Sequence, residues 1–399
     1  MKRKVFQRLI SIILSVFIVF ITNTGYAINS VEVNTQPAST ITEDFPINIS
    51  SKSAILMDTV TGQVLIAKNV NEELPPASVT KIMSLLIIME AIEDGKITLT
   101  DTVTVSETAA KKGGSQIWLE VGEKMTVDEL LKATVVASAN DACTALGEFV
   151  AGSESAFISM MNERAKQLGM INTNFENCTG LDDTTDNHYT SAYDIALMSR
   201  ELLKYNLIIE YSTIWMDYLR DGATELVNTN KLIRTYDGIT GLKTGTTSKA
   251  GCCVSASATR GNTSFVVVVL GAENSSKRFA DAKALLDWGF ANYEVYTPQI
   301  DAEMINELHV INGVTQRFIP ICEKTESILI PKGQGVNVKQ VTELADNVAA
   351  PIEKGQVVGK IKFILSDEEI CSFKLYSEFE IPKMTFSHGI KKLLSVLVD

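Results

Sequence analysis

The stretch PPASVTKIMSLLIIMEAIEDG, residues 75–95, is the part of the sequence from which the fold can first be predicted. Two prolines interrupt the backbone, and Ser78 then opens an apolar run that Gly95 closes. This pattern predicts a helix from residue 79 to about residue 93. Lys81 follows Ser78 by one helical turn, so the two side chains are expected on one face, within hydrogen-bond reach.

Strand patterns lie on both sides of a helical block. Upstream, two apolar runs flank Thr61-Gly62, which is typical of a hairpin. The run Phe265–Leu270 is apolar throughout, so it predicts a strand buried on both faces. The order predicts an α+β domain, an antiparallel sheet flanked by helices, with an inserted all-helical lobe and a cleft between them. The expected strands are 53–58, 63–67, 241–246, 253–258 and 264–271, and the expected helices after residue 95 are 127–136, 141–150, 154–168, 191–203 and 279–290.

The two ends of the chain differ from this middle part. A basic start, an apolar run over 9–21 and the small-x-small sequence at 25–27 predict a signal peptide, with a retained N-terminal anchor as the alternative. Near the C-terminus, Phe386, Ile390 and Leu394 fall on one face of an amphipathic helix suited to a membrane surface. We expect a signal peptide over 1–27, a linker over 28–47, the α+β domain over 48–298, a small all-β domain over 299–382 and the membrane-associating helix over 383–399.

Composition excludes several classes of protein. The net charge is −12, and removal of the four basic residues of the signal peptide makes it −16, which argues against a nucleic-acid partner. The six cysteines form no C-x-x-C pair and no zinc-type spacing with histidine, so we expect no metal and no cofactor. We expect the thiols to be core residues, with a disulfide, which an extracellular location would permit, as the alternative. None of the three histidines sits in a triad motif, so a serine hydrolase would need another base here.

Three short motifs occur in order: Ser78-Val79-Thr80-Lys81, Ser138-Ala139-Asn140 and Lys243-Thr244-Gly245. A serine hydroxyl becomes a nucleophile when a base takes its proton, and a lysine whose pKa is lowered by burial can be that base. Ser138 lies between two expected helices, where it could relay a proton to a leaving amine, and Asn140 could hold a peptide carbonyl. The alternative is that these residues only cap helices.

The third motif lies on an expected strand. Gly245 lets a ligand backbone approach closely, while Lys243 and Thr244 supply a positive charge and a hydroxyl for a carboxylate. The backbone N–H groups of Thr246 and Ser78 could together form a two-donor oxyanion hole. A plain strand with a bulge is the alternative.

Together the motifs resemble the penicillin-recognising serine enzymes. Further stretches resemble the D-alanyl-D-alanine carboxypeptidases among the low-molecular-mass penicillin-binding proteins, and this resemblance continues past Arg278 and Trp288-Gly289-Phe290 into the all-β domain. It therefore covers most of the mature chain. The stretches are PASVTK at 76–81, NCTGLD at 177–182, DGITGLKTGT at 237–246 and AGCC at 250–253.

The resemblance implies a β-lactamase/transpeptidase-like domain that hydrolyses peptidoglycan stem peptides ending in D-Ala-D-Ala. It implies Ser78 as the nucleophile, Lys81 as the base and Ser138 as the proton shuttle. It also implies that Lys243 and Thr244 hold the terminal carboxylate with help from Arg278, for which a surface arginine at a helix start is the alternative. β-Lactams would be inhibitors, and the C-terminal helix would rest on the outer face of the cytoplasmic membrane.

Two rival functions remain open at this point. A class A β-lactamase shares the three motifs, but it needs a Glu-x-x-Leu-Asn loop before Lys243, and no segment between Asn140 and Lys243 supplies one. A catalytically silent, envelope-binding protein on the same scaffold is the other rival. Intact Ser78, Lys81 and Lys243 argue against it, because a binding module has no use for an activated nucleophile.

Overall fold

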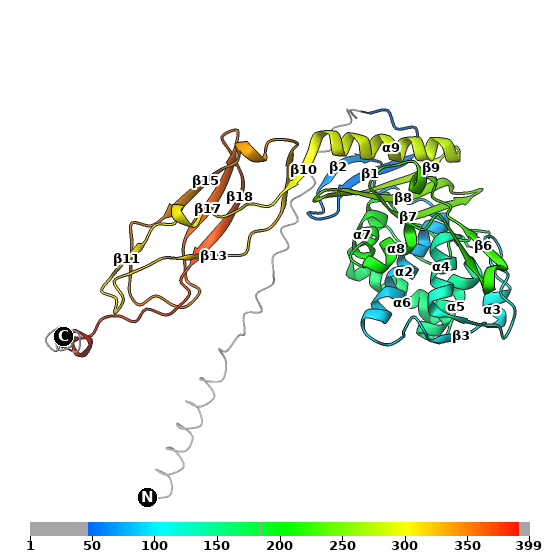
Figure 1. Cartoon of the computed structure of the whole chain (residues 1–399), viewed down its shortest axis with the longest axis horizontal. Coiled ribbons are helices and arrows are strands. Elements are labelled where there is room, and N and C mark those ends of the chain that lie inside the picture. The colour runs from blue at the N-terminus through cyan, green and yellow to red at the C-terminus, as the bar shows by residue number, and fades with distance from the viewer. Residues whose placement is uncertain (1–46, 184, 391–399) are drawn as a thin grey trace, which may run out of the picture. The chain divides into compact units, whose positions relative to one another are not determined.

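The computed structural model describes residues 47–183 and 185–390 (Figure 1). The predicted signal peptide, nearly all of the predicted linker and residues 391–399 of the predicted tail helix lie outside the described residues. The N-terminal part of the described chain forms an α+β domain, and the C-terminal part is all-β.

A five-stranded antiparallel sheet with the order β2-β1-β9-β8-β7 is the centre of the α+β domain. All five strands were predicted, with ends that differ by a few residues. Strand β7 forms one edge, because among the described residues it pairs with β8 alone. The strands are β1 (Ser53–Asp58), β2 (Val64–Lys68), β7 (Ile239–Thr247), β8 (Gly251–Arg260) and β9 (Thr263–Ala272).

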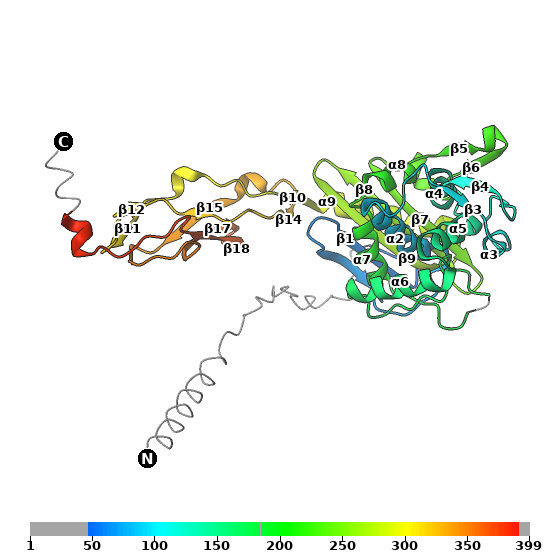
Figure 2. The ribbon, with the colours of Figure 1, turned by 90° about the horizontal axis from the view of Figure 1, so that it is seen from below.

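Both faces of this sheet are covered, as the run of valines in β9 predicts. Val266 and Val268 belong to the core shared with the helical lobe, whereas Val267 and Val269 belong to the core on the opposite face. That opposite face is covered by helix α9 (Ser275–Asn292), as Figure 1 shows, while Figure 2 shows the domain from below, with helices of the lobe in front of the sheet. Burial of alternate side chains on two faces explains why this strand carries no polar residue between 265 and 270.

The helical lobe is inserted between β2 and β7, and its predicted helices are confirmed to within one or two residues. Side-chain caps define several starts: Thr126 forms a capping box with Glu129, and Ser153 and Ser191 each accept a backbone N–H of the first turn. The short helices α3 and α8 were not predicted. The helices are α2 (Lys81–Glu93), α3 (Glu107–Ala110), α4 (Val127–Val136), α5 (Asn140–Ala151), α6 (Glu154–Gln167), α7 (Ala192–Leu202) and α8 (Asn206–Ser212).

The prediction that Ser78 opens the α-helix was wrong in one detail. Ser78 lies in a separate 3-10 turn, η1 (Ala77–Thr80), and α2 starts only at Lys81. Ala77 has a φ of 50°, in the left-handed region, so the chain turns sharply just before Ser78. Tertiary contacts, described below, hold this turn.

The sequence pattern did not predict two small hairpins. They pair β3 (Thr102–Thr104) with β4 (Lys124–Thr126), and β5 (Met216–Leu219) with β6 (Thr224–Val227). Strands of three or four residues give too short a pattern for recognition. Two 3-10 turns, η2 (Arg220–Gly222) and η3 (Lys231–Arg234), flank β6.

The C-terminal part consists of short strands around two apolar clusters centred on Ile352 and Phe363. This confirms the predicted all-β domain. Of the predicted tail helix, residues 386–390 are helical and the remainder lies outside the described part of the chain. The strands are β10 (Tyr293–Tyr296), β11 (Leu308–Ile311), β12 (Arg317–Phe318), β13 (Ile321–Cys322), β14 (Ile328–Pro331), β15 (Lys339–Leu344), β16 (Asn347–Ala349), β17 (Val357–Leu365) and β18 (Glu368–Tyr376), with 3-10 turns η4 (Ala302–Met304) and η5 (Gly335–Asn337).

Candidate active site

The structure brings Ser78, Lys81 and Asn140 together. Lys81 Nζ lies 3.1 Å from Ser78 Oγ, 2.5 Å from Asn140 Oδ1 and 2.8 Å from the carbonyl oxygen of Thr179. These contacts join the turn before α2, the start of α5 and a loop nearly a hundred residues further along. The amine of Lys81 is therefore held directly beside the Ser78 hydroxyl by groups from three separate segments.

Burial makes the amine of Lys81 easier to deprotonate than that of an ordinary lysine. The side chain is fully buried, and loss of solvation lowers the pKa of Lys81 to about 8. Asp141 and the thiols of Cys143 and Cys178 act in the opposite direction. Desolvation is the main cause, as the sequence led us to expect. At pH 7 about a tenth of such an amine is neutral and able to accept a proton.

Two glycines allow the Ser78 turn to be clamped. A Cβ on Gly180 would lie 1.8 Å from the carbonyl oxygen of Ala77, and a Cβ on Gly245 would lie 2.8 Å from the backbone nitrogen of Ser78. Only a residue without a side chain fits at either place. The turn is thus packed between the 177–182 loop on one side and β7 on the other, which fixes the half-buried Ser78.

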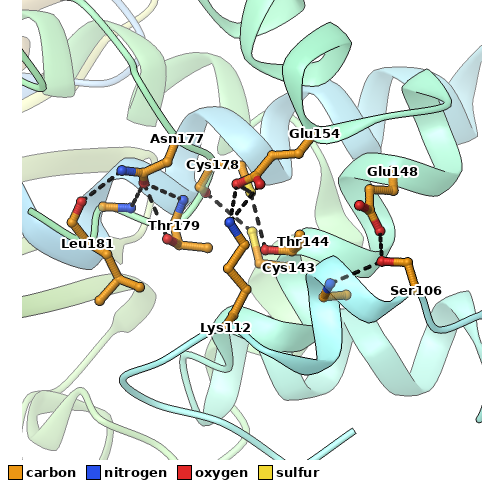
Figure 3. Close-up of polar contacts among 12 residues, drawn as sticks. Ser106, Lys112, Cys143, Thr144, Glu148, Glu154, Asn177, Cys178, Thr179 and Leu181 are labelled. Carbon is orange, nitrogen blue, oxygen red and sulfur yellow. Dashed lines mark hydrogen bonds and ion pairs between the residues drawn. The ribbon is translucent and has the colours of Figure 1, made fainter. Parts of the chain in front are cut away.

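Figure 3 shows how the 177–182 loop is built. The side-chain oxygen of Asn177 accepts the backbone N–H groups of Thr179 and Gly180 at 3.0 and 2.6 Å, and its amide donates to the carbonyl of Leu181 at 2.7 Å. This local turn aims the carbonyl of Thr179 at Lys81. Thr179 was not a predicted site residue, although an Asn-x-Thr-Gly sequence is a recognisable turn signal.

The same loop is tied to the helical lobe beneath the site. The carbonyl oxygen of Cys178 accepts the Cys143 thiol at 3.4 Å, and the Cys178 thiol lies 3.5 Å from the carboxylate of Glu154. Lys112 pairs with this carboxylate at 2.6 Å. All six cysteines lie in the described residues with free thiols, and Cys143 and Cys178 are buried core residues.

The second motif forms the junction between α4 and α5, as predicted. Ser138 is buried and has a φ of 64°, so the chain turns there in the left-handed region. Asn140 is fixed by its side-chain amide, which donates to the carbonyl of Gly113 at 2.7 Å, and by its backbone N–H, which donates to Ser115 at 2.7 Å. Its oxygen is thereby left facing Lys81.

The third motif lies on the edge strand. Lys243 is 1 % exposed, and burial, followed by the positive charges of Lys81 and Arg278, lowers its pKa well below the ordinary value. Thr244 Oγ1 donates to Thr229 Oγ1 at 2.7 Å. A carboxylate bound beside Lys243 would favour the charged form of its amine and so raise the lowered pKa. The site is therefore suited to an anionic ligand.

Arg278 is not a surface residue, so the alternative considered for it was wrong. The side chain is buried, and its Nη1 donates to the carbonyl of Gly245 at 3.0 Å, to Thr246 Oγ1 at 3.2 Å and to the carbonyl of Cys253 at 3.2 Å. It therefore links α9 to the end of the third motif across the sheet edge.

His188 behaves as a structural residue. Its Nδ1 accepts the backbone N–H of Glu176 at 3.0 Å, so its Nε2 carries the proton and donates to Thr80 Oγ1 at 2.8 Å. Burial lowers the pKa of His188 to about 4, which keeps the ring neutral at ordinary pH. Through its hydrogen bond to Thr80, the ring stabilises the turn that carries Ser78.

Within residues 47–183 and 185–390, no three His, Cys, Asp or Glu side chains gather as a metal site would require. In the same part of the chain, no helix has both the length and the apolar character needed to cross a membrane.

Comparison with known sequences gives two family matches. Residues 38–274 match a family described as D-alanyl-D-alanine carboxypeptidase, and residues 293–383 match the C-terminal domain of penicillin-binding protein 5. The chain is 43 % identical over 349 residues to the D-alanyl-D-alanine carboxypeptidase DacF of Bacillus subtilis, covering 86 % of this chain and 89 % of DacF. It is 37 % identical over 332 residues to DacC of Escherichia coli, covering 81 % and 82 %.

Solved structures agree with the sequence matches. Penicillin-binding protein 5 of Haemophilus influenzae superposes with a TM-score of 0.74 at 32 % identity, covering 85 % of this chain and 99 % of that one. Penicillin-binding protein D2 of Listeria monocytogenes, in an ampicillin-bound form, superposes with a TM-score of 0.56 at 28 % identity, covering 61 % and 98 %. The match to protein D2 thus covers a smaller part of this chain than the match to penicillin-binding protein 5.

Proposed function

The chain belongs to the D-alanyl-D-alanine carboxypeptidase family of serine peptidases, and on that premise we propose that Ser78 is the nucleophile with which it removes the terminal D-Ala from peptidoglycan stem peptides. The family is a cell-envelope peptidoglycan family, and neither rival, β-lactamase or silent binding protein, is favoured by the relatives. The observation that carries the assignment is the 3.1 Å contact between Lys81 Nζ and Ser78 Oγ inside a fully buried amine site.

Acylation begins when neutral Lys81 takes the proton of Ser78. The Ser78 oxygen forms a bond to the carbonyl carbon of the penultimate D-Ala, and the carbonyl oxygen becomes an oxyanion that accepts the backbone N–H groups of Ser78 and Thr246. As the C–N bond breaks, Ser138 passes to the leaving amine the proton that Lys81 took from Ser78, so Lys81 becomes neutral again and free D-Ala departs. Water then cleaves the ester and regenerates the Ser78 hydroxyl.

The substrate is held at both sides of the scissile bond. Lys243 and Thr244 bind its terminal carboxylate. Asn140 accepts Lys81 with its side-chain oxygen and donates with its side-chain amide to a peptide carbonyl. Gly245 leaves room for the ligand backbone beside Ser78. Arg278 supports the carboxylate site through its hydrogen bonds to Gly245 and Thr246.

A β-lactam places its strained amide where the scissile peptide bond would lie, so we propose that it acylates Ser78 too. The opened ring stays tethered and keeps its leaving group in the site, which slows hydrolysis of the adduct. The penicillin-binding relatives support this step, and one of them was solved with ampicillin bound.

Mass spectrometry of the intact protein after benzylpenicillin tests the nucleophile. We expect one added antibiotic mass, placed on the peptide that contains Ser78 after digestion, and D-Ala release from an acyl-D-Ala-D-Ala peptide. Ser78→Ala should lose both the adduct and the release. An adduct on another residue, or unchanged release by Ser78→Ala, would contradict the mechanism.

We also propose where the enzyme works. The basic and apolar start over residues 1–27 supports export, and the apolar stripe of residues 383–399 supports peripheral binding to the outer face of the cytoplasmic membrane. In this scheme residues 28–47 are a linker, 48–298 the catalytic domain and 299–382 a β domain that precedes the membrane-associating segment in the sequence.

A further inference from the structure

Trp118 is an exposed aromatic residue held in an unusual backbone conformation. Its side chain is 77 % exposed, while the neighbouring Ile117 and Leu119 are buried. Its φ is 57°, a region that bulky residues rarely adopt and that persists only when the surroundings enforce it. The indole thus gains little burial from this conformation.

The backbone around Trp118 is fixed from two sides. The Asp141 carboxylate accepts the N–H groups of Ile117 and Leu119, each at 3.1 Å. From the other side, Arg220 donates to the carbonyl of Ile117 at 2.8 Å and pairs with Glu123 at 2.8 Å. Asp141 directly follows Asn140, so the segment that carries the indole is anchored to the same helix start that contributes Asn140 to the active site.

The hairpin β5–β6 is tied to the Trp118 segment and carries further exposed side chains. Met216 pairs with Val227 and Tyr218 pairs with Glu225, so these side chains share one face of the hairpin, and Met216, Tyr218 and Val227 are exposed. Arg220 follows two residues after Tyr218 and reaches the Trp118 segment. We call Trp118, Met216, Tyr218 and Val227 the aromatic rim.

The aromatic rim is joined to the active site at a second point. Thr229, two residues after Val227, accepts the hydroxyl of Thr244 at 2.7 Å. The rim thus connects to the site through Asn140 on one side and through Thr244 on the other. A surface built this way is suited to hold the part of a substrate that extends out of the site.

We propose that the aromatic rim binds the sugar chain of peptidoglycan while Ser78 acts on an attached stem peptide. Sugar rings carry faces of C–H groups that pack against indole and phenol rings, and their hydroxyls tolerate the partly wet edge of such a site. Five extended residues span roughly 17 Å, so a sugar at the amino end of a stem peptide can lie outside the site while the carboxyl end occupies it. This inference rests on the proposed carboxypeptidase function and extends it to the substrate class.

The test compares two substrates that differ in the sugar. One is a short acyl-D-Ala-D-Ala peptide, and the other is a disaccharide that carries a full stem peptide; D-Ala release gives kcat/KM for each. In Trp118→Ala we expect the ratio of the sugar-bearing to the sugar-free kcat/KM to fall about tenfold, as for truncation of one aromatic anchor. Trp118→Tyr should keep most of the ratio, because it retains a ring.

Controls separate this effect from damage to the fold. Ile171 is 87 % exposed, and Ile171→Ala should leave the ratio as in the wild type. The rate of acylation by fluorescent penicillin reports an intact site in each variant. Tyr218→Ala, on the hairpin, needs no strained backbone and should also lower the ratio, which keeps the test valid if Trp118→Ala folds poorly.

The outcomes are distinct. An unchanged ratio in both Trp118→Ala and Tyr218→Ala overturns the inference and leaves the carboxypeptidase function intact; this is also the result if the rim binds a protein or a membrane. If the wild-type enzyme releases D-Ala from neither substrate, the proposed function fails, and the inference fails with it. A fall of the ratio that Trp118→Tyr restores supports the inference.

Discussion

Burial of Lys81 sets the pH at which Ser78 can be activated. Because the neutral amine is the base and its pKa is about 8, acylation should rise about tenfold per pH unit below pH 8 and level off above it. The rate of acylation by a fluorescent penicillin, measured across this range, gives the profile. Lys81→Ala should slow acylation by several orders of magnitude at every pH. A flat profile through pH 8 would show that Lys81 is not the base.

Lys243 is expected to recognise the charge at the end of the substrate. Lys243→Ala should lower kcat/KM for peptides with a free terminal carboxylate, because a desolvated, charge-assisted contact is lost. The fall should correspond to a loss of about 2–4 kcal/mol of transition-state stabilisation. For otherwise identical amidated peptides the loss should be much smaller. Equal losses of kcat/KM on the two substrates would show that Lys243 does not bind the terminal carboxylate.

At the scale of elements, Gly180 allows the 177–182 loop to pack against the Ser78 turn. In Gly180→Ala the new Cβ would collide with the carbonyl of Ala77, so the turn must move, and we expect acylation to slow at least tenfold with a loss of about 1–3 kcal/mol in stability. Gly169→Ala is the matched control, since Gly169 has a similar φ of 74° but nothing within 4 Å. Similar acylation rates in the two variants would mean that the clash does not matter.

The sequence predicted well those elements that have a long period or a side-chain cap. Helix α4 agrees with its prediction at both ends, and the capping box of Thr126 and Glu129 marks its start. The turn at Ser78 was not predicted, because the left-handed Ala77 depends on Gly180 and Gly245, which are distant in sequence. The same reason hides the contact between Thr179 and Lys81, the burial of Arg278 and the strained Trp118.

The site residues illustrate the same limit. The motif order alone suggested that Ser78, Lys81 and Asn140 meet, and the structure places them in contact. It did not reveal that the Lys81 side chain is completely buried, which is the main cause of its lowered pKa. Desolvation depends on how completely the lobe and the sheet enclose the amine, and no local sequence pattern reports that.

For the whole molecule, the C-terminal segment should determine membrane association but not catalysis. Phe386 is largely exposed at the start of the proposed amphipathic helix, where its ring is available to insert into a membrane surface. Deletion of residues 384–399 should release the protein from membrane fractions and leave kcat/KM on soluble peptides within about twofold. Sedimentation of the truncated protein with membranes would contradict the anchor.

The position of β7 at the edge of the sheet has a consequence for how broadly the enzyme acts. A strand edge presents main-chain N–H and C=O groups, and a ligand that lies along it is recognised through its own backbone. Side-chain identity then contributes little, whereas the chirality and the free end of the ligand contribute much. We therefore expect this active site to tolerate chemical variety along the stem peptide, so that an organism could remodel its wall without having to remodel the enzyme.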